Sequence, residues 1–449
     1  MDLFGTAGIR GDAQTTVTPT FALAIGRAVA EAADTTPTVA LGHDGRTTSP
    51  GLAAAVEAGL TSGGATVRRI GQVPTPTLAY ASRDHHGVMI TASHNPPTDN
   101  GIKLFVDGTE YDTDAEARVE AAYNAEPGPV AYDAWGTATD ASVLEAYHEA
   151  VIAYVTDRVG GYDGLRVAVD CGNGVGGIVT PQVLSDLGAQ TVSLNANVDG
   201  TFPARESKPT PESLTETRAF VADADVDLGL AHDGDADRLV VIGPDGELIH
   251  EDTVVAILAE QYVRWSDATE PVVITTPNAS GRIDDRVTAA GGQIRRTALG
   301  TLHEAIAATD TPVAFAAEPW KHVHPAFGGW IDGICSAALI TGLVAEAGGI
   351  ASLIEPVDER PYRKESLPCP EAAKADAMAT LTADLPEQFP EATVDTEYGV
   401  RLAFDNGDWV LIRPSGTESY LRLYAESEDL DAFLAPIETT VEDAIEDAQ

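Results

Sequence analysis

Residues 38–91 alternate strand-like and helix-like segments, and this order limits the possible folds more than any other feature of the chain. The apolar runs at 38–42, 65–70 and 87–91 are typical of buried strands. Between them, residues 49–60 and 74–84 predict helices, the first with Pro50 in its opening turn. A strand–helix–strand–helix–strand order predicts a parallel sheet with right-handed crossovers, and therefore an α/β fold.

Similar units follow along the chain. Its 449 residues are enough for about three or four domains of roughly 100–150 residues each. A helix predicted at 140–157 joins the first unit to the second, and the last unit has a different order of helices and strands, typical of an α+β domain. We predict three similar mixed α/β domains and a C-terminal α+β domain, with the ranges 1–150 (domain I), 151–252 (domain II), 253–358 (domain III) and 359–449 (domain IV).

The chain is strongly acidic, with 70 Asp and Glu residues against 27 Lys and Arg residues and a formal net charge of −43. This charge argues against nucleic acid or an anionic membrane as a partner, because both would be repelled. The acidic residues are spread along a chain that is 44% hydrophobic, so disorder does not explain them. Only five of the basic residues are lysines. We interpret this composition as that of a halophilic enzyme, since salt screens self-repulsion.

The remaining global features indicate a cytoplasmic protein. No apolar run is long enough to span a bilayer, and the first residues lack the basic and apolar regions of a signal peptide. Cys171, Cys335 and Cys369 lie far apart, without the spacing of a metal site. Buried thiols in a reducing compartment explain them.

The segment 87–103 contains a candidate nucleophile. Its apolar strand runs into Thr91 and Ser93, and Asn95-Pro96-Pro97 then forces the chain out of regular structure. Ser93 is therefore expected at the carboxyl end of a strand, where open α/β sheets bind ligands. The alternative is an ordinary polar turn.

The segment 233–238 follows another predicted strand and carries carboxylates at alternate positions, on Asp233, Asp235 and Asp237. Three such groups in a glycine-containing loop can converge on one hard cation. A calcium EF-hand is rejected, since the positions that require Gly and Glu hold Arg238 and Pro244. Magnesium completed by a substrate phosphate fits better, and a solvated acidic turn is the alternative.

Three other loops carry weaker signals. The segment 413–418 combines Arg413 with Ser415, Gly416 and Thr417 between two strands, which suits a phosphate site or a tight β-turn. The segment 4–11 combines flexible glycines with Arg10, an anion-binding candidate. The segment 172–177 fits a dinucleotide-binding pattern, but the acid that follows it, Asp199, stands in a turn, so we do not predict NAD binding.

Together, these motifs resemble those of the α-D-phosphohexomutases, the family of phosphoglucomutase, phosphomannomutase and phosphoglucosamine mutase. The resemblance covers essentially the whole chain in order: 4–11 is similar to the opening loop, 91–96 to the phosphoserine motif, 233–238 to the magnesium loop and 413–418 to the phosphate-binding loop. It implies four domains around a central cleft.

The resemblance also implies a mechanism. Ser93, phosphorylated at rest, would transfer its phosphoryl group to a hexose phosphate, forming a hexose 1,6-bisphosphate that serves as intermediate and activator. One Mg²⁺ per active site would be held by the phosphorylated Ser93 with Asp233, Asp235 and Asp237. Lys103 matches the proposed general acid/base of the family.

Further roles follow from the same resemblance. His94 would support the phosphoryl group or share the acid/base role, and Arg10 and Arg238 would stabilise the transferring group. The non-reacting phosphate of the substrate would be held by the 413–418 loop, through Arg413, Ser415, Gly416 and Thr417.

The sugar-reading loop departs from the family pattern. Where the family usually reads Gly-Glu-Met-Ser-Gly-His or Gly-Glu-Gln-Ser-Gly-His, residues 317–322 read Ala-Glu-Pro-Trp-Lys-His. Glu318 can still accept hydrogen bonds from sugar hydroxyls, and Trp320 either stacks on the sugar or fills the domain core. His322, with Lys321, would add a cationic contact.

We therefore predict a phosphohexomutase acting on hexose 1- and 6-phosphates, with glucose or mannose phosphate favoured and glucosamine phosphate as the alternative. Candidates from other classes are a magnesium-dependent sugar phosphatase and a non-catalytic sugar-phosphate sensor. The protein is expected to be a monomer or homodimer.

Overall fold

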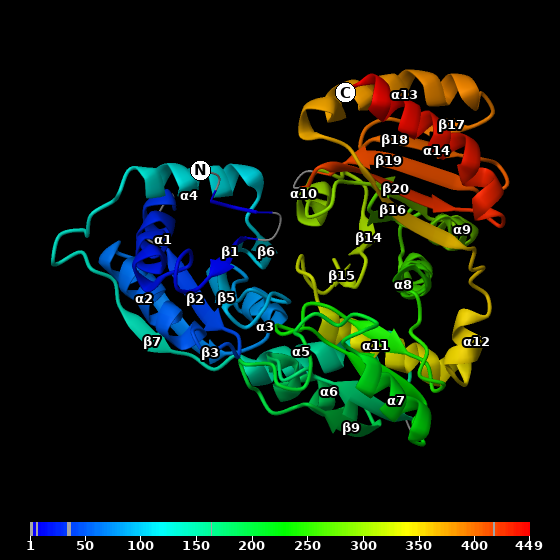
Figure 1. Ribbon diagram of the computed structural model, residues 1–449. Coiled ribbons are helices and arrows are strands. Elements are labelled where there is room, and N and C mark those ends of the chain that lie inside the picture. Colours follow the sequence, from blue (N-terminus) through cyan, green and yellow to red (C-terminus); the bar gives the residue numbers. More distant parts are fainter. Residues whose placement is uncertain (1–2, 6–7, 34–36, 163, 416–417) are drawn as a thin grey trace.

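The computed structural model describes residues 3–5, 8–33, 37–162, 164–415 and 418–449. In these residues the strands form four sheets, and each sheet lies within one of the four predicted sequence ranges. The first three sheets are mixed and the fourth is antiparallel, each with its own helices (Figure 1). The predicted fold class, three mixed α/β domains followed by an α+β domain, is confirmed, while the boundaries themselves stay predictions.

The sheet of domain I has the strand order β1-β5-β4-β2-β3-β7, with β6 paired to β5. The predicted parallel pairing is present, since β2 lies between β3 and β4 and runs parallel to both. Strand β5 runs antiparallel to both of its neighbours, β4 and β1. The elements are β1 (Ile9–Asp12), α1 (Pro19–Ala32), β2 (Thr38–His43), α2 (Ser49–Ser62), β3 (Thr66–Gln72), α3 (Thr75–Ala81), β4 (His86–Ile90), β5 (Asp99–Val106), β6 (Thr109–Glu110), α4 (Thr113–Asn124) and β7 (Ala138–Asp140).

Domains II and III each have a four-stranded sheet, with the orders β11-β10-β8-β9 and β13-β12-β14-β15. The linking helix is α5 (Leu144–Thr156). Domain II continues with β8 (Arg166–Asp170), η1 (Val175–Ile178), α6 (Thr180–Asp186), β9 (Gln190–Leu194), α7 (Thr215–Asp223), β10 (Leu228–Ala231) and β11 (Val240–Ile242). The later elements are α8 (Glu251–Trp265), β12 (Val272–Thr275), α9 (Gly281–Ala289), β13 (Gln293–Arg296), α10 (Leu302–Ala307), β14 (Val313–Glu318), β15 (Lys321–Val323), α11 (Gly333–Ala347) and α12 (Ile350–Ile354).

One hydrophobic core joins domains II and III. Val169 of β8, Leu230 of β10, Phe315 of β14 and Leu339 of α11 belong to the same buried cluster. Helix α11 contacts α5 and α6 as well as its own domain. Domains II and III therefore share one close-packed interior.

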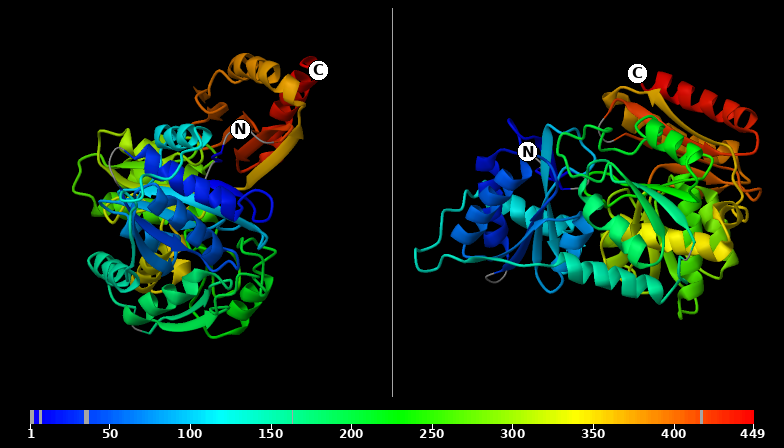
Figure 2. Two further views of the ribbon diagram at one scale, coloured as in Figure 1. Left: turned by 90° about the vertical axis from the view of Figure 1, so that its left-hand side faces the viewer. Right: turned by 90° about the horizontal axis from the view of Figure 1, so that it is seen from below.

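Domain IV has a separate core and an antiparallel sheet in the order β16-β20-β19-β18-β17. Its helices α13 and α14 cover one face of this sheet (Figure 2). The elements are β16 (Tyr362–Pro368), η2 (Glu371–Ala373), α13 (Lys374–Gln388), β17 (Thr393–Asp395), β18 (Val400–Ala403), β19 (Trp409–Pro414), β20 (Tyr420–Glu426) and α14 (Leu430–Asp447).

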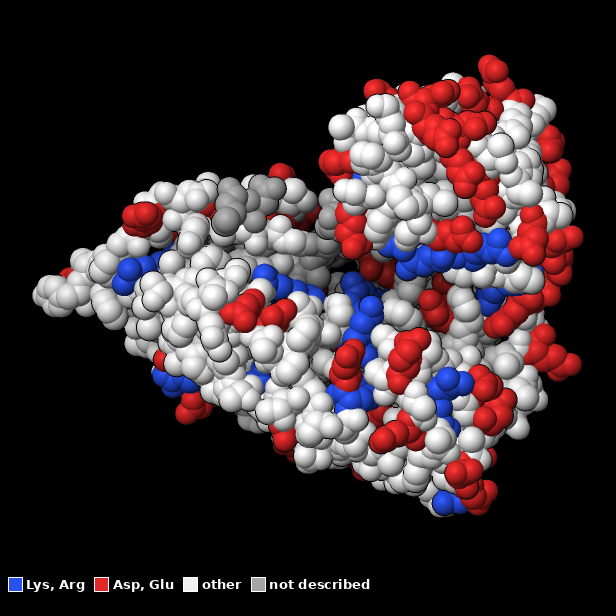
Figure 3. Space-filling model, viewed as in Figure 1, with Lys and Arg blue, Asp and Glu red and all other residues white. Residues whose placement is uncertain are grey.

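The domains surround a deep recess, visible between the two lobes in Figure 3. At this place lies a cavity of about 720 Å³ to which all four domains contribute, for example through Arg10, Arg238, Glu318 and Tyr424. This is the central cleft that the resemblance implied. Among the described residues, no helix combines the length and apolar character needed to cross a membrane.

Candidate active site

Ser93 lies in the loop after β4, at the carboxyl edge of the domain I sheet. Its side chain is buried, and its hydroxyl donates to Asp233 Oδ2 of domain II over 2.6 Å. His94 Nδ1 lies 3.3 Å from the same hydroxyl oxygen. The candidate nucleophile therefore meets the candidate metal loop across the boundary between two domains.

The backbone of Ser93 has a φ of 50°, a left-handed conformation that is uncommon for a residue with a side chain. Its N–H donates to Thr91 Oγ1 over 2.9 Å, and its carbonyl accepts hydrogen bonds from Arg46 Nη2 and Ser207 Oγ, both at 2.8 Å. Surrounding groups thus fix both peptide units of the residue. Arg46 and Ser207 were not found from the sequence.

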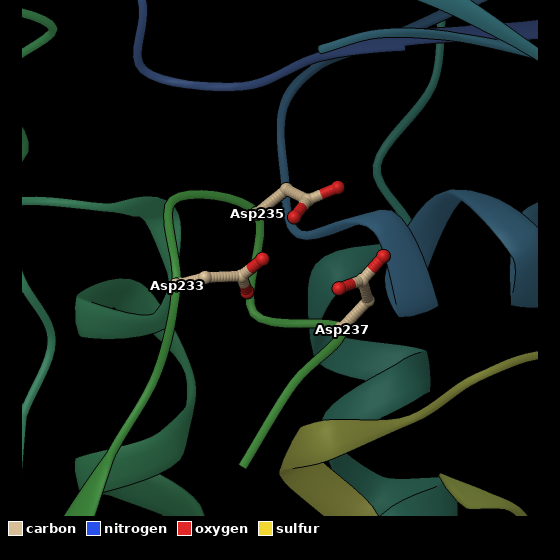
Figure 4. Close-up of side chains that lie close together, drawn as sticks. All are labelled: Asp233, Asp235 and Asp237. Atoms are coloured by element: carbon tan, nitrogen blue, oxygen red, sulfur yellow. The ribbon is translucent and has the colours of Figure 1, made fainter. Parts of the chain in front are cut away.

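Asp233, Asp235 and Asp237 are buried and point toward one another from the loop after β10 (Figure 4). One carboxylate oxygen of each lies within 4.8 Å of those of the other two. Asp235 Oδ1 and Asp237 Oδ1 are buried without a hydrogen-bond partner among the described residues. Convergent oxygen ligands with unused acceptor atoms fit a hard divalent cation such as Mg²⁺.

The glycine-rich segment 172–177 supports this metal loop. Val175 N donates to Gly234 O over 3.1 Å, and a Cβ added to Gly174 would lie 2.7 Å from the same oxygen. Only glycine permits so close an approach of two backbones. The segment that fits a dinucleotide pattern therefore has a structural use here, in support of the 233–238 loop.

Two cations balance the carboxylates. Lys103, on β5, donates to Asp237 Oδ2 over 2.7 Å and to Asp235 Oδ2 over 3.3 Å. Arg238 Nε lies 3.7 Å from Asp233 Oδ2 and 3.8 Å from Asp237 Oδ1. Burial by itself would lower the pKa of Lys103, but Asp235 and Asp237 raise it above its ordinary value, so this lysine is protonated.

The pKa values of the ionisable groups near Ser93 are shifted in different directions. Burial, together with Arg238 and Arg10, lowers the pKa of His94 to about 2, so its imidazole is neutral. Burial and the charges of Asp237 and Asp235 raise the pKa of Asp233 well above its ordinary value. For Asp237, the attraction of Lys103 and Arg238 outweighs burial and lowers the pKa. Ionisable groups beside a cavity with pKa values shifted this strongly are typical of catalytic sites.

The predicted sugar-reading residues Glu318 and Trp320 line the cavity. Glu318 accepts hydrogen bonds from Gly300 N at 2.5 Å and from Lys321 Nζ at 3.2 Å. Trp320 has a φ of 64° and also packs against the small apolar cluster of Val240 in domain II. Trp320 therefore borders the cavity and packs against domain II, while its stacking on the sugar stays a prediction.

His322 is not among the residues that line the cavity. It is buried, and its Nδ1 lies 3.0 Å from Ser336 Oγ of α11. The alternation of β15 directs neighbouring side chains to opposite faces, so Lys321 borders the cavity while His322 faces inward. A substrate contact for His322 stays a prediction that this placement does not support.

In the predicted phosphate loop of domain IV, Arg413 Nη2 donates to Tyr424 Oη over 3.1 Å. The carbonyl oxygen of Ser415 accepts from Lys374 Nζ over 2.7 Å. Arg413 and Ser415 do not line the cavity themselves, although Tyr424 does. The candidates Gly416 and Thr417 lie outside the described residues.

Four of the five lysines lie at the cavity, at its carboxylates or near His94, and the fifth supports the predicted phosphate loop of domain IV. Lys103 contacts the carboxylates, and Lys321 and Lys364 line the cavity. Lys374 supports the phosphate loop, and Lys208 is near enough to His94 to lower its pKa. In Figure 3, Lys and Arg gather in the recess while Asp and Glu cover the outer surface of domain IV.

The cavity also includes residues that sequence reasoning missed: Asp252, Asn278, Tyr362, Lys364 and Tyr424. Asn278 follows β12 at the carboxyl edge of the domain III sheet, as Glu318 ends the parallel neighbouring strand β14. A search for polar residues after every predicted parallel strand would have found Asn278. The side chains on β16 and β20 carry no comparable signal.

Residues 1–128 match the family described as phosphoglucomutase/phosphomannomutase, alpha/beta/alpha domain I. Residues 145–246 match alpha/beta/alpha domain II of the same group, and residues 367–438 match its C-terminal domain.

Individual proteins are also similar. A probable phosphoglucosamine mutase of Methanopyrus kandleri is 39% identical over 434 residues, covering 95% of this chain and 94% of that protein. A phosphopentomutase of Thermococcus kodakarensis is 38% identical over 433 residues, with the same coverage. A crystal structure of a phosphoglucomutase/phosphomannomutase family protein from Burkholderia thailandensis has a TM-score of 0.88 and 25% identity, covering 100% of this chain and 97% of that one.

Proposed function

This chain belongs to the α-D-phosphohexomutase family, and we propose that it interconverts hexose 1-phosphate and hexose 6-phosphate through a phosphorylated Ser93. It is an isomerase of the phosphomutase type. The observation that carries the proposal is the 2.6 Å hydrogen bond from Ser93 Oγ to Asp233 Oδ2, inside a buried carboxylate triad beside the cavity.

The proposed reaction has two phosphoryl transfers. In the first, a free hydroxyl of the sugar phosphate loses its proton and bonds to phosphorus, while the bond between phosphorus and Ser93 Oγ breaks and Oγ gains a proton. The hexose 1,6-bisphosphate then reorients in the cleft. In the second, Ser93 Oγ loses its proton and bonds to the other phosphorus, and the sugar oxygen that leaves this phosphorus gains a proton. The isomeric monophosphate is released, and the enzyme returns to its phosphorylated state.

Residues of the site supply the charges and protons. Arg10 and Arg238 line the cavity beside His94, where they would stabilise the transferring phosphoryl oxygens. Lys103 is the proposed acid/base, and neutral His94 the proposed support for Ser93 Oγ. The family is Mg²⁺-dependent, and one Mg²⁺ bound by Asp233, Asp235 and Asp237 would neutralise negative charge on the phosphoryl group.

Sugar specificity is proposed from the surroundings of Glu318. Lys321 neutralises this carboxylate over 3.2 Å, which favours a neutral sugar over one that carries an ammonium group. Glucose or mannose phosphate therefore stays our first candidate. Glucosamine phosphate is the second, supported by the name of the Methanopyrus relative, and a pentose phosphate is a third, supported by the name of the Thermococcus relative.

A substrate panel tests the proposal. Glucose, mannose, glucosamine, N-acetylglucosamine and pentose 1-phosphates would each be supplied with Mg²⁺ and a trace of the corresponding bisphosphate. We expect the isomeric phosphate from at least one hexose, and none from a Ser93→Ala variant. Free phosphate without isomer would indicate a sugar phosphatase, and binding without turnover would indicate a sensor.

We also propose that the enzyme works in the cytoplasm at high salt. The three cysteines are buried and unpaired, as expected in a reducing compartment. With a net charge of −43, self-repulsion should destabilise the fold at low salt. Thermal unfolding at about 0.1 M and about 1 M KCl, where the Debye lengths are about 10 and 3 Å, tests this: equal stabilities would contradict it.

A further inference from the structure

The left-handed backbone at Ser93 needs an explanation in the structure around it. A side chain in this region is disfavoured, and such a conformation persists only where the surroundings hold it. The Cβ of Ser93, and with it the direction of Oγ, depends on this one backbone conformation. Whatever holds the loop therefore determines where the nucleophile points.

Arg46 is the group that holds it. Its side chain is fully buried, and its guanidinium has five N–H donors, each with an acceptor. Nη2 donates to two carbonyl oxygens of the serine loop, Ser93 O and Asn95 O, each over 2.8 Å. Nη1 donates to Pro96 O over 2.6 Å and to Asp99 O over 3.0 Å. The fifth donor, Nε, lies 3.1 Å from Asp44 Oδ2.

Asp44 extends the same network to the other side of Ser93. Its Oδ2 accepts from Thr91 Oγ1 over 2.7 Å, and Thr91 Oγ1 in turn accepts from Ser93 N over 2.9 Å. The ion pair of Asp44 and Arg46 thus contacts both sides of Ser93. Asp44 holds its N–H through the hydroxyl of Thr91, and Arg46 binds its carbonyl oxygen directly. The planar guanidinium of arginine can donate to four carbonyl oxygens at once, whereas the compact ammonium group of lysine cannot reach them all.

Two residues of domain II also contact this network. Ser207 Oγ donates to Ser93 O over 2.8 Å and accepts from Gly234 N over 3.1 Å, so it ties the serine loop to the metal loop. The ring of Phe202 stacks on the Arg46 guanidinium, with its centroid 5.1 Å from Cζ.

We propose that Arg46 is a positioning residue of phosphoryl transfer: through the carbonyl oxygens of the serine loop it fixes the direction of Ser93 Oγ toward Asp233. The inference rests on the proposed role of Ser93. Arg46 does not line the cavity, so it acts on the reaction only through this loop. Because Ser93 must meet both ends of the substrate in turn, a small error in its direction slows both transfers.

The test compares Arg46→Lys with the wild type on whichever hexose 1-phosphate the panel identifies. We expect a kcat about 100-fold lower, the scale of a 1 Å misplacement, with KM changed by less than about threefold, because the sugar contacts lie in other domains. A kcat within about threefold of the wild type would overturn the inference.

A double-mutant cycle separates positioning from general loss of structure. Ser207→Ala removes the other donor to Ser93 O, so its effect on kcat should differ between the wild-type and Arg46→Lys backgrounds. Arg282→Lys is the matched control: Arg282 is equally buried and ion-paired, 3.1 Å from Glu426, at the boundary of domains III and IV. In that background the effect of Ser207→Ala should be unchanged, and equal effects in all three backgrounds would overturn the inference.

Two further measurements distinguish failure of the proposed role of Arg46 from failure of the proposed function of Ser93. If Arg46→Lys does not fold, Ser207→Ala alone should lower kcat with an unchanged KM, and an unaffected kcat would overturn the inference. Incubation of the wild type with a labelled hexose bisphosphate should phosphorylate Ser93. An unlabelled wild type refutes the proposed function itself, whereas equal labelling rates of wild type and Arg46→Lys refute only the role of Arg46.

Discussion

Replacing Lys103 with methionine should make the stability of the enzyme depend more strongly on Mg²⁺. Lys103 Nζ lies 2.7 Å from Asp237 Oδ2 and 3.3 Å from Asp235 Oδ2, and all three side chains are at least 97% buried. In the absence of metal, this ammonium group is the cation nearest to these two carboxylates that the structure describes. Methionine keeps the approximate length of the side chain and removes the charge.

The size of the effect follows from the burial. Removing one partner of a buried ion pair costs about 3–5 kcal/mol, because the other charge is left uncompensated. A bound Mg²⁺ restores positive charge at the same carboxylates. At 100 times Kd, a ligand stabilises the folded state by about 2.7 kcal/mol, and at 1,000 times Kd by about 4.1 kcal/mol. A tenfold tighter Kd in the variant would therefore recover about 1.4 kcal/mol of the loss.

The assay is thermal unfolding of wild type and Lys103→Met over a series of Mg²⁺ concentrations, with EDTA as the metal-free reference. Lys374→Met is the control, since Lys374 is also buried and ion-paired, to Glu371, but lies in domain IV away from the carboxylates. We expect Mg²⁺ to raise the Tm of Lys103→Met more than that of the wild type or the control. Equal Mg²⁺-dependent shifts in all three proteins would refute the idea that Lys103 compensates the metal ligands.

Three further predictions concern other parts of the molecule. Trp320→Ala should weaken substrate binding by about 0.5–1.5 kcal/mol, an increase in KM of up to about tenfold, and an unchanged KM in initial-rate assays would restrict Trp320 to packing. Burial lowers the pKa of His322 to about 3, below its unfolded value, so the stability it supports is complete above about pH 6.5 and falls as the pH decreases. Urea unfolding between pH 7 and 5 should show a shallower loss for His322→Gln, by up to about 1.4 kcal/mol per pH unit. Glu426 accepts hydrogen bonds from Arg282 and Trp409, so Glu426→Gln should destabilise domain IV by about 1.5–3 kcal/mol. Urea unfolding monitored by Trp409 fluorescence measures this effect, and an unchanged unfolding midpoint would contradict it.

The sequence was sufficient to predict the parallel part of domain I, because apolar runs punctuated by glycine and proline specify strands and helices locally. It did not reveal β5, where Lys103 interrupts Ile102 and Leu104 and all three are buried. A charged residue in a buried strand has no local signal, since its partners lie more than 130 residues away. The mixed character of the sheet follows from this antiparallel strand.

The convergence of the three carboxylates could be predicted for the opposite reason: they are close in the sequence, and the alternation of Asp233, Asp235 and Asp237 is itself the signal. Arg46 could not, because Asp44-Gly45-Arg46 has the composition of an exposed turn. Its burial depends on the serine loop folding over it. The same limit applies to the common core of domains II and III, which arises from contacts between helices far apart in the chain.

The placement of the lysines has a practical consequence for chemical labelling. Apart from the N-terminal amine and Lys374, which binds Ser415 O in domain IV, the primary amines of this chain lie at the cavity, at the carboxylates or near His94. A general amine reagent, such as an activated ester, would therefore behave as an active-site reagent, with the exposed side chain of Lys364 as its most accessible target. Protection by a sugar phosphate, measured by mass spectrometry of the labelled peptides, would then report cleft occupancy without any assay of turnover.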